Sequence, residues 1–245
     1  MADVYKGIPI NTTKNTHKVV FELINASKDA VIADMPSGAG AFVKRLTDHG
    51  YTHVLAMDIA CALVFDHPGF LKGDMTKPLP FADQSVDVFV CIDGIEHISD
   101  QFFFVAEVNR VLKKGGTFIL STPNISALRS RFRWLMTGHH HKCKAPLDEN
   151  RPSPLHHIGM VSFPELRYML HTKGFAISRI STNRIKWVSW LHAIWMPLVL
   201  VFTTFTYRKE GRIEGTTQLN KAVKASMFSK PVLFGETLII KAEKA

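Results

Sequence analysis

The sequence predicts an α/β protein with an open, mostly parallel, seven-stranded sheet and helices on both faces. In the first half of the chain, short apolar runs alternate with amphipathic stretches of helical periodicity, which is the pattern of repeated βαβ units. Crossovers of this length join parallel strands and are right-handed almost without exception. Acidic residues follow several of the apolar runs, at the strand ends where open sheets bind ligands.

The predicted elements follow one another with short turns between them. Residues 30–33 form a buried strand, and residues 41–49 form a helix that presents Phe42, Val43 and Leu46 on one face and stops at Gly50. By the same reasoning we expect strands at 53–57, 70–73, 86–92, 117–121, 175–182 and 232–241, and helices at 102–112 and 163–172.

The charge of the chain is unevenly distributed. Its 245 residues carry a formal net charge of +9, which favours a nucleic-acid or anionic-membrane partner. Residues 1–124 have a net charge of −3, whereas residues 125–245 have +12 and hold all four tryptophans. The composition is that of a globular protein and excludes a disordered tail or a disulfide scaffold. We expect one domain over 1–245, with the cofactor-binding half at 16–124.

The cysteines and the amino terminus favour a cytoplasmic protein. Cys61, Cys91 and Cys143 are too widely spaced for a metal quartet or a disulfide framework, as is common in a reducing compartment. The first 15 residues, MADVYKGIPINTTKN, lack the apolar run and cleavage site of a secretory signal.

The first predicted strand leads into a glycine-containing turn. Gly38 and Gly40 would let the backbone approach a ligand closely and turn into the following helix. Asp34, at the end of the strand, would repel a dinucleotide pyrophosphate but suits a ligand with an ammonium or sulfonium group. The junction therefore predicts a cationic cofactor in place of a nicotinamide dinucleotide.

Two more acids stand at the ends of the next strands. Asp58 follows the second strand, where such sheets place a carboxylate that binds the ribose hydroxyls of a nucleoside. Asp74 closes the third strand. Carboxylates also cap helices and fill turns at strand ends, but three at successive parallel strand ends lie along one crevice.

Further motifs follow in a characteristic order. They are LPFADQSVDV at 79–88, CIDGIEHI at 91–98, EVNRVLKKGG at 107–116 and STPN at 121–124. With these motifs the chain resembles class I S-adenosylmethionine-dependent methyltransferases, with a Rossmann-like sheet, from about residue 16 to 182 and over the last strand. It departs from their pattern at Pro36, where they usually have a first glycine, and at Asp93, where glutamate is more usual.

This resemblance implies S-adenosylmethionine as the cofactor and a set of contacts to it. Asp34, Gly38 and Gly40 would line its methionine portion. Asp58 with Ile59 would bind the ribose, and Asp74 with Met75 the adenine. Asp93, in the loop after the fourth strand, completes the expected cofactor-binding set.

Methyl transfer to a hydroxyl needs an oriented acceptor and a base. We expect His97 or His157 to serve as this catalytic base, because a neutral imidazole is available at pH 7. For each histidine a structural hydrogen bond is the alternative. The run His139–Cys143 contains three adjacent histidines, but adjacent residues rarely converge on one ion, so we predict a surface loop and no metal.

The basic, aromatic half contains two unusual segments. Within a predicted insertion or lid at 125–162, residues 125–136 form a basic amphipathic stretch that suits a membrane interface or a lid packed on the core. Within the apolar segment 185–210, residues 187–207 contain no Asp, Glu, Lys or Arg. This segment could lie on or dip into a membrane, span it, or pack as a buried lid or dimer helix.

A basic, aromatic half facing an anionic membrane favours an amphiphilic acceptor. The overall pattern also resembles bacterial methyltransferases of surface-polysaccharide and lipid-linked glycan assembly. We therefore expect O-methylation of a sugar or other hydroxyl on a lipid-linked acceptor, by a cytoplasmic protein peripheral to the inner face of the membrane. A methyltransferase acting on a soluble metabolite or on RNA is one alternative, although nucleic acid is the less favoured partner. A non-catalytic binding module is the other.

Overall fold

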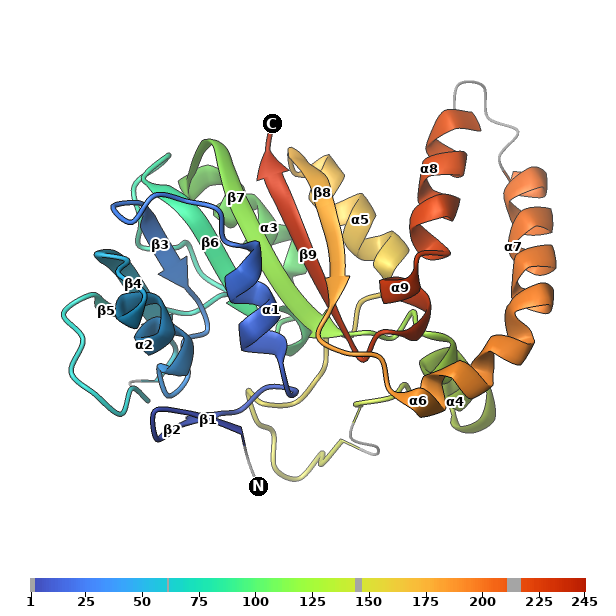
Figure 1. The fold of residues 1–245 in the computed structure, drawn as a ribbon, viewed down its shortest axis with the longest axis horizontal. Helices are drawn as coiled ribbons and strands as arrows, with labels where there is room; N and C mark the ends of the chain where they lie inside the picture. Colours follow the sequence, from blue (N-terminus) through green and yellow to red (C-terminus); the bar gives the residue numbers. More distant parts are fainter. Residues whose placement is uncertain (1–2, 61, 144–146, 211–216) are drawn as a thin grey trace.

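The computed structural model describes residues 3–60, 62–143, 147–210 and 217–245, so Cys61 lies outside the described residues. A seven-stranded sheet crosses the molecule in the order β5-β4-β3-β6-β7-β9-β8 (Figure 1). A separate two-stranded hairpin stands at the amino terminus. The strands are β1 (Asp3–Tyr5), β2 (Ile8–Ile10), β3 (Val31–Asp34), β4 (His53–Asp58), β5 (Phe70–Lys72), β6 (Val86–Ile92), β7 (Leu112–Pro123), β8 (Phe175–Thr182) and β9 (Thr237–Lys244).

The sheet confirms the predicted fold class. Strands β3 to β7 pair in parallel, and β9 pairs antiparallel with both β7 and β8. The helical elements are α1 (Thr16–Leu23), α2 (Ala41–Asp48), η1 (Ile95–His97), α3 (Gln101–Val111), α4 (Leu128–Thr137), α5 (Phe163–Thr172), α6 (Trp187–Trp190), η2 (Leu191–Trp195), α7 (Met196–Glu210), α8 (Thr217–Met227) and α9 (Lys230–Phe234).

Helices cover both faces of the sheet because successive strand residues point to opposite sides. In β6, Val88 and Val90 pack with α1 and α2, whereas Phe89 packs on the other face with α3 and α5. Ser162 and Glu165 form a capping box that starts α5 at the predicted residue. The result is a three-layer α/β/α arrangement with a core on each side of the sheet.

The last predicted strand was wrong in its first part. Residues Val232, Leu233 and Phe234 are buried in α9, and the strand begins only at Thr237. A short apolar run does not distinguish a buried strand from a buried helical turn by periodicity alone. The β1–β2 hairpin, α1 and α8 were not predicted.

The apolar segment forms an exposed helical arm. Trp187–Arg208 is continuously helical over 22 residues, and its most apolar 18-residue stretch has a mean hydropathy of 1.6 and is only 6% buried. In Figure 1, α7 projects from the body of the molecule with α8 beside it. Thr204 accepts a hydrogen bond from Lys224 of α8 at 2.6 Å. The segment is therefore not a lid buried in the core of this chain.

Candidate active site

A cavity of about 650 Å³ lies at the carboxyl ends of the parallel strands. Its wall contains residues from the turns after β3, β4, β5 and β6 and from the amino-terminal segment. The predicted site residues that line it are Asp34, Gly38, Asp58, Ile59, Asp74, Met75, Asp93, His97 and His157. Of the predicted set, Gly40 is the exception.

Gly40 shapes the turn without forming the cavity wall. It has a φ of +88°, and a Cβ there would lie 2.7 Å from both Leu63 and Phe65. Any other residue would meet both the backbone strain and this overlap. Gly40 therefore positions the turn, and its predicted contact with the cofactor stays a prediction.

The glycine turn is bound to the end of the next strand. The amide of Gly38 donates a hydrogen bond to Oδ2 of Asp58 at 2.8 Å, and the amide of Ala60 donates to Oδ1 at 3.1 Å. These bonds fix the carboxylate in the cavity wall and leave further acceptor positions on both oxygens.

Asp34 is a buried carboxyl group with no counterion among the described residues. It is 1% exposed, and neither carboxyl oxygen has a hydrogen-bond partner in that part of the chain. Burial, and then the negative charge of Asp58, raises its pKa well above the ordinary value. A ligand with a positive charge would supply the missing partner, so the site fits the ammonium and sulfonium of S-adenosylmethionine.

The remaining predicted cofactor residues are held by short loops. Asp74 accepts hydrogen bonds at 2.8 Å from the amide and the hydroxyl of Thr76, which orders the turn beside Met75. Asp93 has a φ of +47° and accepts a bond from the hydroxyl of Ser121 at 2.6 Å. Burial raises the pKa of Asp93, although the Ser121 bond and the charge of Lys142 oppose the shift.

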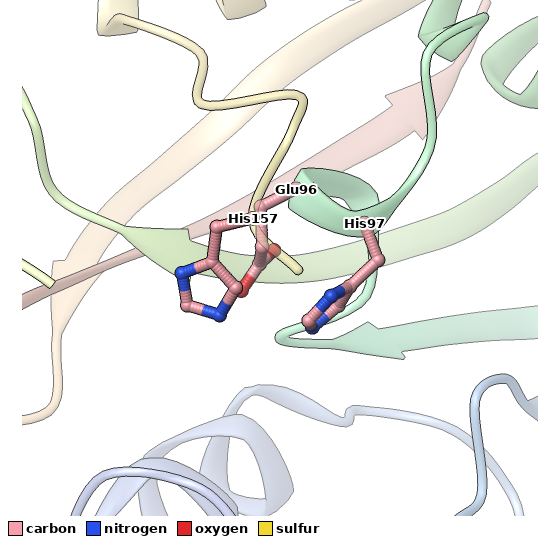
Figure 2. Close-up of side chains that lie close together, drawn as sticks. All are labelled: Glu96, His97 and His157. Atoms are coloured by element: carbon pink, nitrogen blue, oxygen red, sulfur yellow. The ribbon is translucent and has the colours of Figure 1, made fainter. Parts of the chain in front are cut away.

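The two predicted catalytic histidines lie side by side. The ring centroids of His97 and His157 are 4.8 Å apart, with the rings nearly perpendicular. Figure 2 shows both side chains with that of Glu96, all three projecting from η1 and the adjoining loop toward the same region. Glu96 stands in the motif at 91–98 but was not predicted as a site residue.

A backbone clamp brings these residues together from distant parts of the chain. The side-chain amide of Gln101 donates to the carbonyls of Ile95 and Gly159 at 2.8 and 2.5 Å. The amide of Gly159 donates to the carbonyl of Glu96 at 2.8 Å. A Cβ on Gly159 would lie 2.3 Å from the carbonyl oxygen of Ile98, so only glycine allows this approach.

The protonation pattern at this end of the cavity is set by burial. Nδ1 of His97 lies 3.2 Å from the carbonyl oxygen of His156, and since a carbonyl can only accept, Nδ1 is the donor. Burial lowers the pKa of His97, so its ring is neutral at pH 7 with Nε2 unprotonated. Burial, and then the charge of Asp93, raises the pKa of Glu96 well above its ordinary value.

Part of the cavity wall was missed because it comes from the amino terminus. Asn11, Thr12, Thr13 and His17 line the cavity ahead of the first predicted element. Lys142 donates a hydrogen bond to the Thr13 hydroxyl at 3.2 Å and is the only Lys or Arg that lines the cavity within the described ranges. Isolated polar residues in a loop carry no periodicity that would reveal them.

The histidine run is only partly the predicted surface loop. His139 is exposed, while the ring of His140 stacks on Trp134 with centroids 6.0 Å apart. Lys142 instead faces the cavity and lies 3.4 Å from Glu236, which also pairs with Arg184 and Lys186. These cations lower the pKa of Glu236 to about 2, against the opposing effect of its burial.

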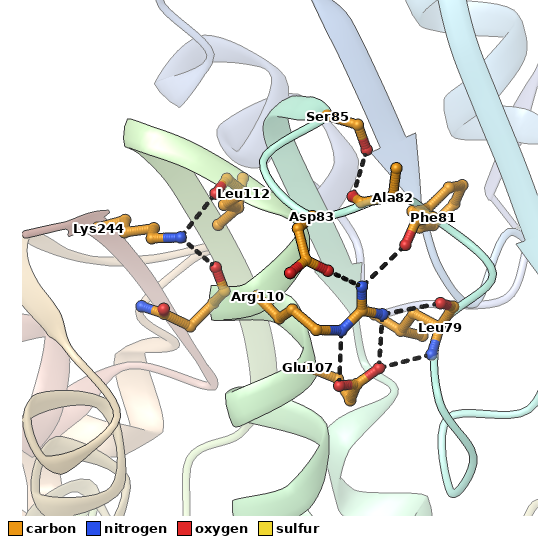
Figure 3. Close-up of polar contacts among 10 residues, drawn as sticks. Leu79, Phe81, Ala82, Asp83, Ser85, Glu107, Arg110, Leu112 and Lys244 are labelled. Atoms are coloured by element: carbon orange, nitrogen blue, oxygen red, sulfur yellow. Dashed lines mark hydrogen bonds and ion pairs between the residues drawn. The ribbon is translucent and has the colours of Figure 1, made fainter.

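Two of the sequence motifs form one ion-pair network that supports the cavity (Figure 3). Arg110 of α3 makes a bidentate pair with Glu107, at 2.9 and 2.8 Å, and donates to the carbonyls of Leu79 and Phe81. Glu107 in turn accepts from the amide of Leu79 at 2.8 Å. The motif at 107–116 thereby holds the motif at 79–88 in the path that leads into β6.

Comparison with known proteins points to the same chemistry. Residues 33–120 match the family described as "Methyltransferase domain". A curated relative from Mycolicibacterium smegmatis, named "Probable S-adenosylmethionine-dependent methyltransferase", is 36% identical over 171 residues, which is 66% of this chain and 58% of the relative. The demethylmenaquinone methyltransferase of Renibacterium salmoninarum is 25% identical over 120 residues, which is 46% of this chain and 50% of that one. The chain thus spans 58% and 50% of the lengths of these two relatives.

The fold has solved counterparts as well. The structure of an S-adenosylmethionine-dependent methyltransferase from Mesorhizobium loti superimposes with a TM-score of 0.53, covers 93% of this chain and 96% of that one, and is 14% identical. At this identity the likeness concerns the fold alone. The domain match over 33–120, the curated relatives and the fold together support a class I S-adenosylmethionine-dependent methyltransferase domain, with S-adenosylmethionine as its cofactor.

Proposed function

We propose that the protein transfers a methyl group to a hydroxyl of an amphiphilic acceptor, such as a lipid-linked sugar, while bound to the inner face of an anionic membrane. The observation that carries the choice of acceptor is the exposed apolar arm at Trp187–Arg208. The observation that carries the chemistry is the cavity in which Asp34, Asp58 and the paired histidines meet.

The cofactor half of the cavity supplies complementary groups along the strand ends. When bound, S-adenosylmethionine supplies an electrophilic methyl group on a positively charged sulfur. We assign Asp34 to its cationic groups, Asp58 to the ribose hydroxyls, and Asp74 with Met75 to the adenine. Gly38 and Ile59 complete the wall on either side of Asp58.

His97 and His157 are the candidates to take the proton of the acceptor hydroxyl. Nε2 of His97 is available as an acceptor, because its Nδ1 is committed to the carbonyl of His156. His157 comes from the loop that closes over this end of the cavity and is our choice for the base. A positioned base of this kind contributes roughly 10²–10⁴-fold to a rate.

The helical arm supports attachment to a membrane surface. Large apolar side chains along it are exposed: Trp187 and Ile194 by 77%, Phe202 by 67% and Phe205 by 66%. An unpartnered apolar surface of this extent on a monomer marks an interaction site. Cationic residues at its two ends, exposed Arg208 among them, suit anionic headgroups.

An apolar groove of about 380 Å³ lies between α4 and the arm. Leu128, Phe132 and Leu135 form one side, and Trp195 and Phe202 belong to the other. The chain runs from the cavity to this groove within five residues, from Pro123 to Leu128. The groove would suit the hydrocarbon tail of an acceptor whose polar head reaches the cavity, where Lys142 offers a positive charge.

The relative from Renibacterium, by its name, acts on demethylmenaquinone. The ring of a membrane quinone is therefore a second acceptor class, and it should be assayed together with lipid-linked sugars. RNA and soluble metabolites are the alternatives for an enzyme with a basic half of this kind.

Vesicle flotation tests the membrane part of the proposal. Wild-type protein should float with vesicles that contain anionic lipid and less with neutral vesicles. The double variant Ile194→Glu/Phe205→Glu should lose flotation, whereas Tyr168→Glu, at a residue of α5 exposed by 65%, serves as the matched control. All three proteins should bind S-adenosylmethionine equally. Wild-type protein that ignores anionic vesicles but binds RNA in a salt-sensitive manner would overturn the proposal.

Transfer of radiolabelled methyl groups tests the acceptor class. Labelled S-adenosylmethionine is supplied with lipid, glycan, quinone and RNA fractions of a bacterial extract. We expect label in the lipid-linked fraction and its loss on mild acid hydrolysis that releases the glycan. Label confined to RNA or to water-soluble metabolites would contradict the proposed acceptor.

A further inference from the structure

We propose that Glu96, His97 and His157 form a binding site for one divalent metal ion in the wall of the cavity. Each offers one ligand atom, and these atoms all lie within 4.8 Å of one another. Figure 2 shows the Glu96 carboxyl group beside the ring of His157, with His97 adjoining. This inference goes beyond methyl transfer, since cation binding here does not depend on the identity of the acceptor.

The spacing is close to that of an assembled metal site. Ligands about 2.1 Å from a tetrahedral zinc ion lie about 3.4 Å from one another. The group therefore needs to contract by no more than about 1.4 Å, which side-chain rotation alone can supply.

Glu96 provides an independent indication of a missing partner. Glu96 is fully buried, and neither oxygen of its carboxyl group has a hydrogen-bond partner among the described residues. Buried polar groups in folded proteins are nearly always paired, so such a carboxyl group aimed at the cavity calls for a ligand. A metal cation would provide the charge and the coordination that it lacks.

His97 is already oriented as metal-binding histidines are. Its Nδ1 donates to the carbonyl of His156 at 3.2 Å, which leaves Nε2 as the unprotonated nitrogen. Metal ligands of this type commonly donate their other ring nitrogen to a backbone carbonyl, which fixes tautomer and ring orientation. The accepting carbonyl belongs to His156, the residue directly before His157. This one hydrogen bond therefore aligns the segment that carries His97 with the segment that carries His157.

The clamp built by Gln101 and Gly159 keeps the three ligands together. Gln101 binds carbonyls on both segments, and the amide of Gly159 binds the carbonyl of Glu96 itself. The ligands therefore sit on a preorganised frame, although His157 is 60 residues away from His97 in the sequence. Asp93, which is partly buried and interacts electrostatically with Glu96, adds negative charge that favours a cation.

The ligand set selects the class of metal. Two imidazoles and one carboxylate suit zinc and the neighbouring divalent transition metals more than magnesium or calcium, which prefer oxygen ligands. Three protein ligands leave at least one position open toward the cavity. With a cation bound, His97 and His157 would act as its ligands and not as the base. The cation would take over that role, because it lowers the pKa of a hydroxyl that reaches it.

Cobalt titration tests the site directly. Untagged full-length protein, stripped with a chelator, is titrated with Co²⁺ and followed by visible absorption. Zn²⁺ binding is measured in parallel by calorimetry. We expect one equivalent to bind, with a cobalt spectrum of four or five ligands. His157→Ala and Glu96→Gln should each lower the affinity at least about tenfold, the size of effect expected for one lost ligand contact.

A matched variant separates this site from the histidine run. His140→Ala/His141→Ala removes two imidazoles that lie outside the three-residue group and should leave affinity and stoichiometry unchanged. Circular dichroism reports whether each variant is folded. If Glu96→Gln does not fold, His157→Ala still tests the site, because His157 lies on a half-buried loop.

The outcomes distinguish this inference from the proposed function. Absence of a cobalt spectrum in wild-type protein, unchanged affinity in His157→Ala, or loss of binding in the His140/His141 variant would each overturn the metal site. S-adenosylmethionine binding by the metal-free protein is measured separately, so a failed metal site leaves the methyltransferase proposal standing.

Discussion

The amide of Gly38 donates a hydrogen bond to Oδ2 of Asp58 across 2.8 Å, which joins the turn after β3 to the end of β4. Residues separated by 20 positions thus form one wall of the cavity. The glycine turn and the acid, which the sequence predicts as two separate cofactor contacts, form a single hydrogen-bonded unit. A change at either residue should therefore affect both.

Asp58→Ala should abolish tight cofactor binding. The change removes the carboxylate proposed for the ribose and releases the amides of Gly38 and Ala60. Hydrogen bonds to a charged group contribute about 1.5–3 kcal/mol each, so affinity for S-adenosylmethionine should fall at least about 100-fold. Isothermal titration calorimetry measures this, and Asp58→Asn, which keeps one oxygen acceptor, should fall between wild type and Asp58→Ala. Unchanged binding in Asp58→Ala would refute the cofactor assignment.

Asp34→Asn should raise the stability of the ligand-free protein and weaken cofactor binding. In wild type the folded-state pKa of Asp34 lies above its unfolded value, so the folded state binds more protons and stability falls as pH rises above about 3.8. The variant has no charge to bury, so its thermal midpoint should depend less on pH. Thermal unfolding from pH 5 to 8 checks the slope, and calorimetry checks the cofactor. Equal slopes in the two proteins would contradict the buried, unpartnered carboxyl group.

His157→Ala should reduce turnover by roughly 10²–10⁴-fold while the Kd for S-adenosylmethionine stays the same, because the ring lies at the acceptor end of the cavity. Single-turnover kinetics with labelled cofactor separates the two quantities. His171→Ala, on α5 away from the cavity lining, is the control and should keep full activity. Full activity in His157→Ala would show that another group takes the proton.

Arg110→Ala should destabilise the fold by about 2 kcal/mol, since it breaks the network of Figure 3 and leaves Glu107 without its cation. Urea unfolding monitored by circular dichroism measures the change. Lys18→Ala removes only an exposed pair with Glu22 at 3.9 Å and should cost less than about 0.5 kcal/mol. Comparable losses in the two variants would mean that the network does not support the fold.

The convergence of three acids on one cavity could be predicted because the topology alone brings them together. Asp34, Asp58 and Asp74 follow strands that lie side by side in parallel, so their meeting point needs no knowledge of side-chain contacts. The place of Gly40 in the turn was predicted as well, but its packing against Leu63 and Phe65 was not, because that packing depends on a loop without periodicity.

The other end of the cavity could be predicted only in part. His97 and His157 were both identified, yet their contact and the participation of Glu96 depend on hydrogen bonds from Gln101 and Gly159. Such bonds join loops across 58 residues and leave no pattern in the sequence. Thr12 and Thr13 were not predicted to line the cavity, because their loop also leaves no pattern in the sequence.

The chain between β8 and β9, which includes the helical arm, leaves the sheet and returns to it at the same place. Ile185 and Gly235 form a bridge there, and the side chain of Asn183 accepts from the amide of Thr237 while donating to the carbonyl of Lys14. The arm has a second attachment, because its first part packs on α4, where the rings of Phe132 and Trp195 stack with centroids 5.9 Å apart. A force on the arm would therefore act on the edge strands of the sheet and also on α4. Since α4 begins at Leu128, five residues after Pro123 in the cavity wall, a displacement of the arm on a surface would be transmitted to the cavity.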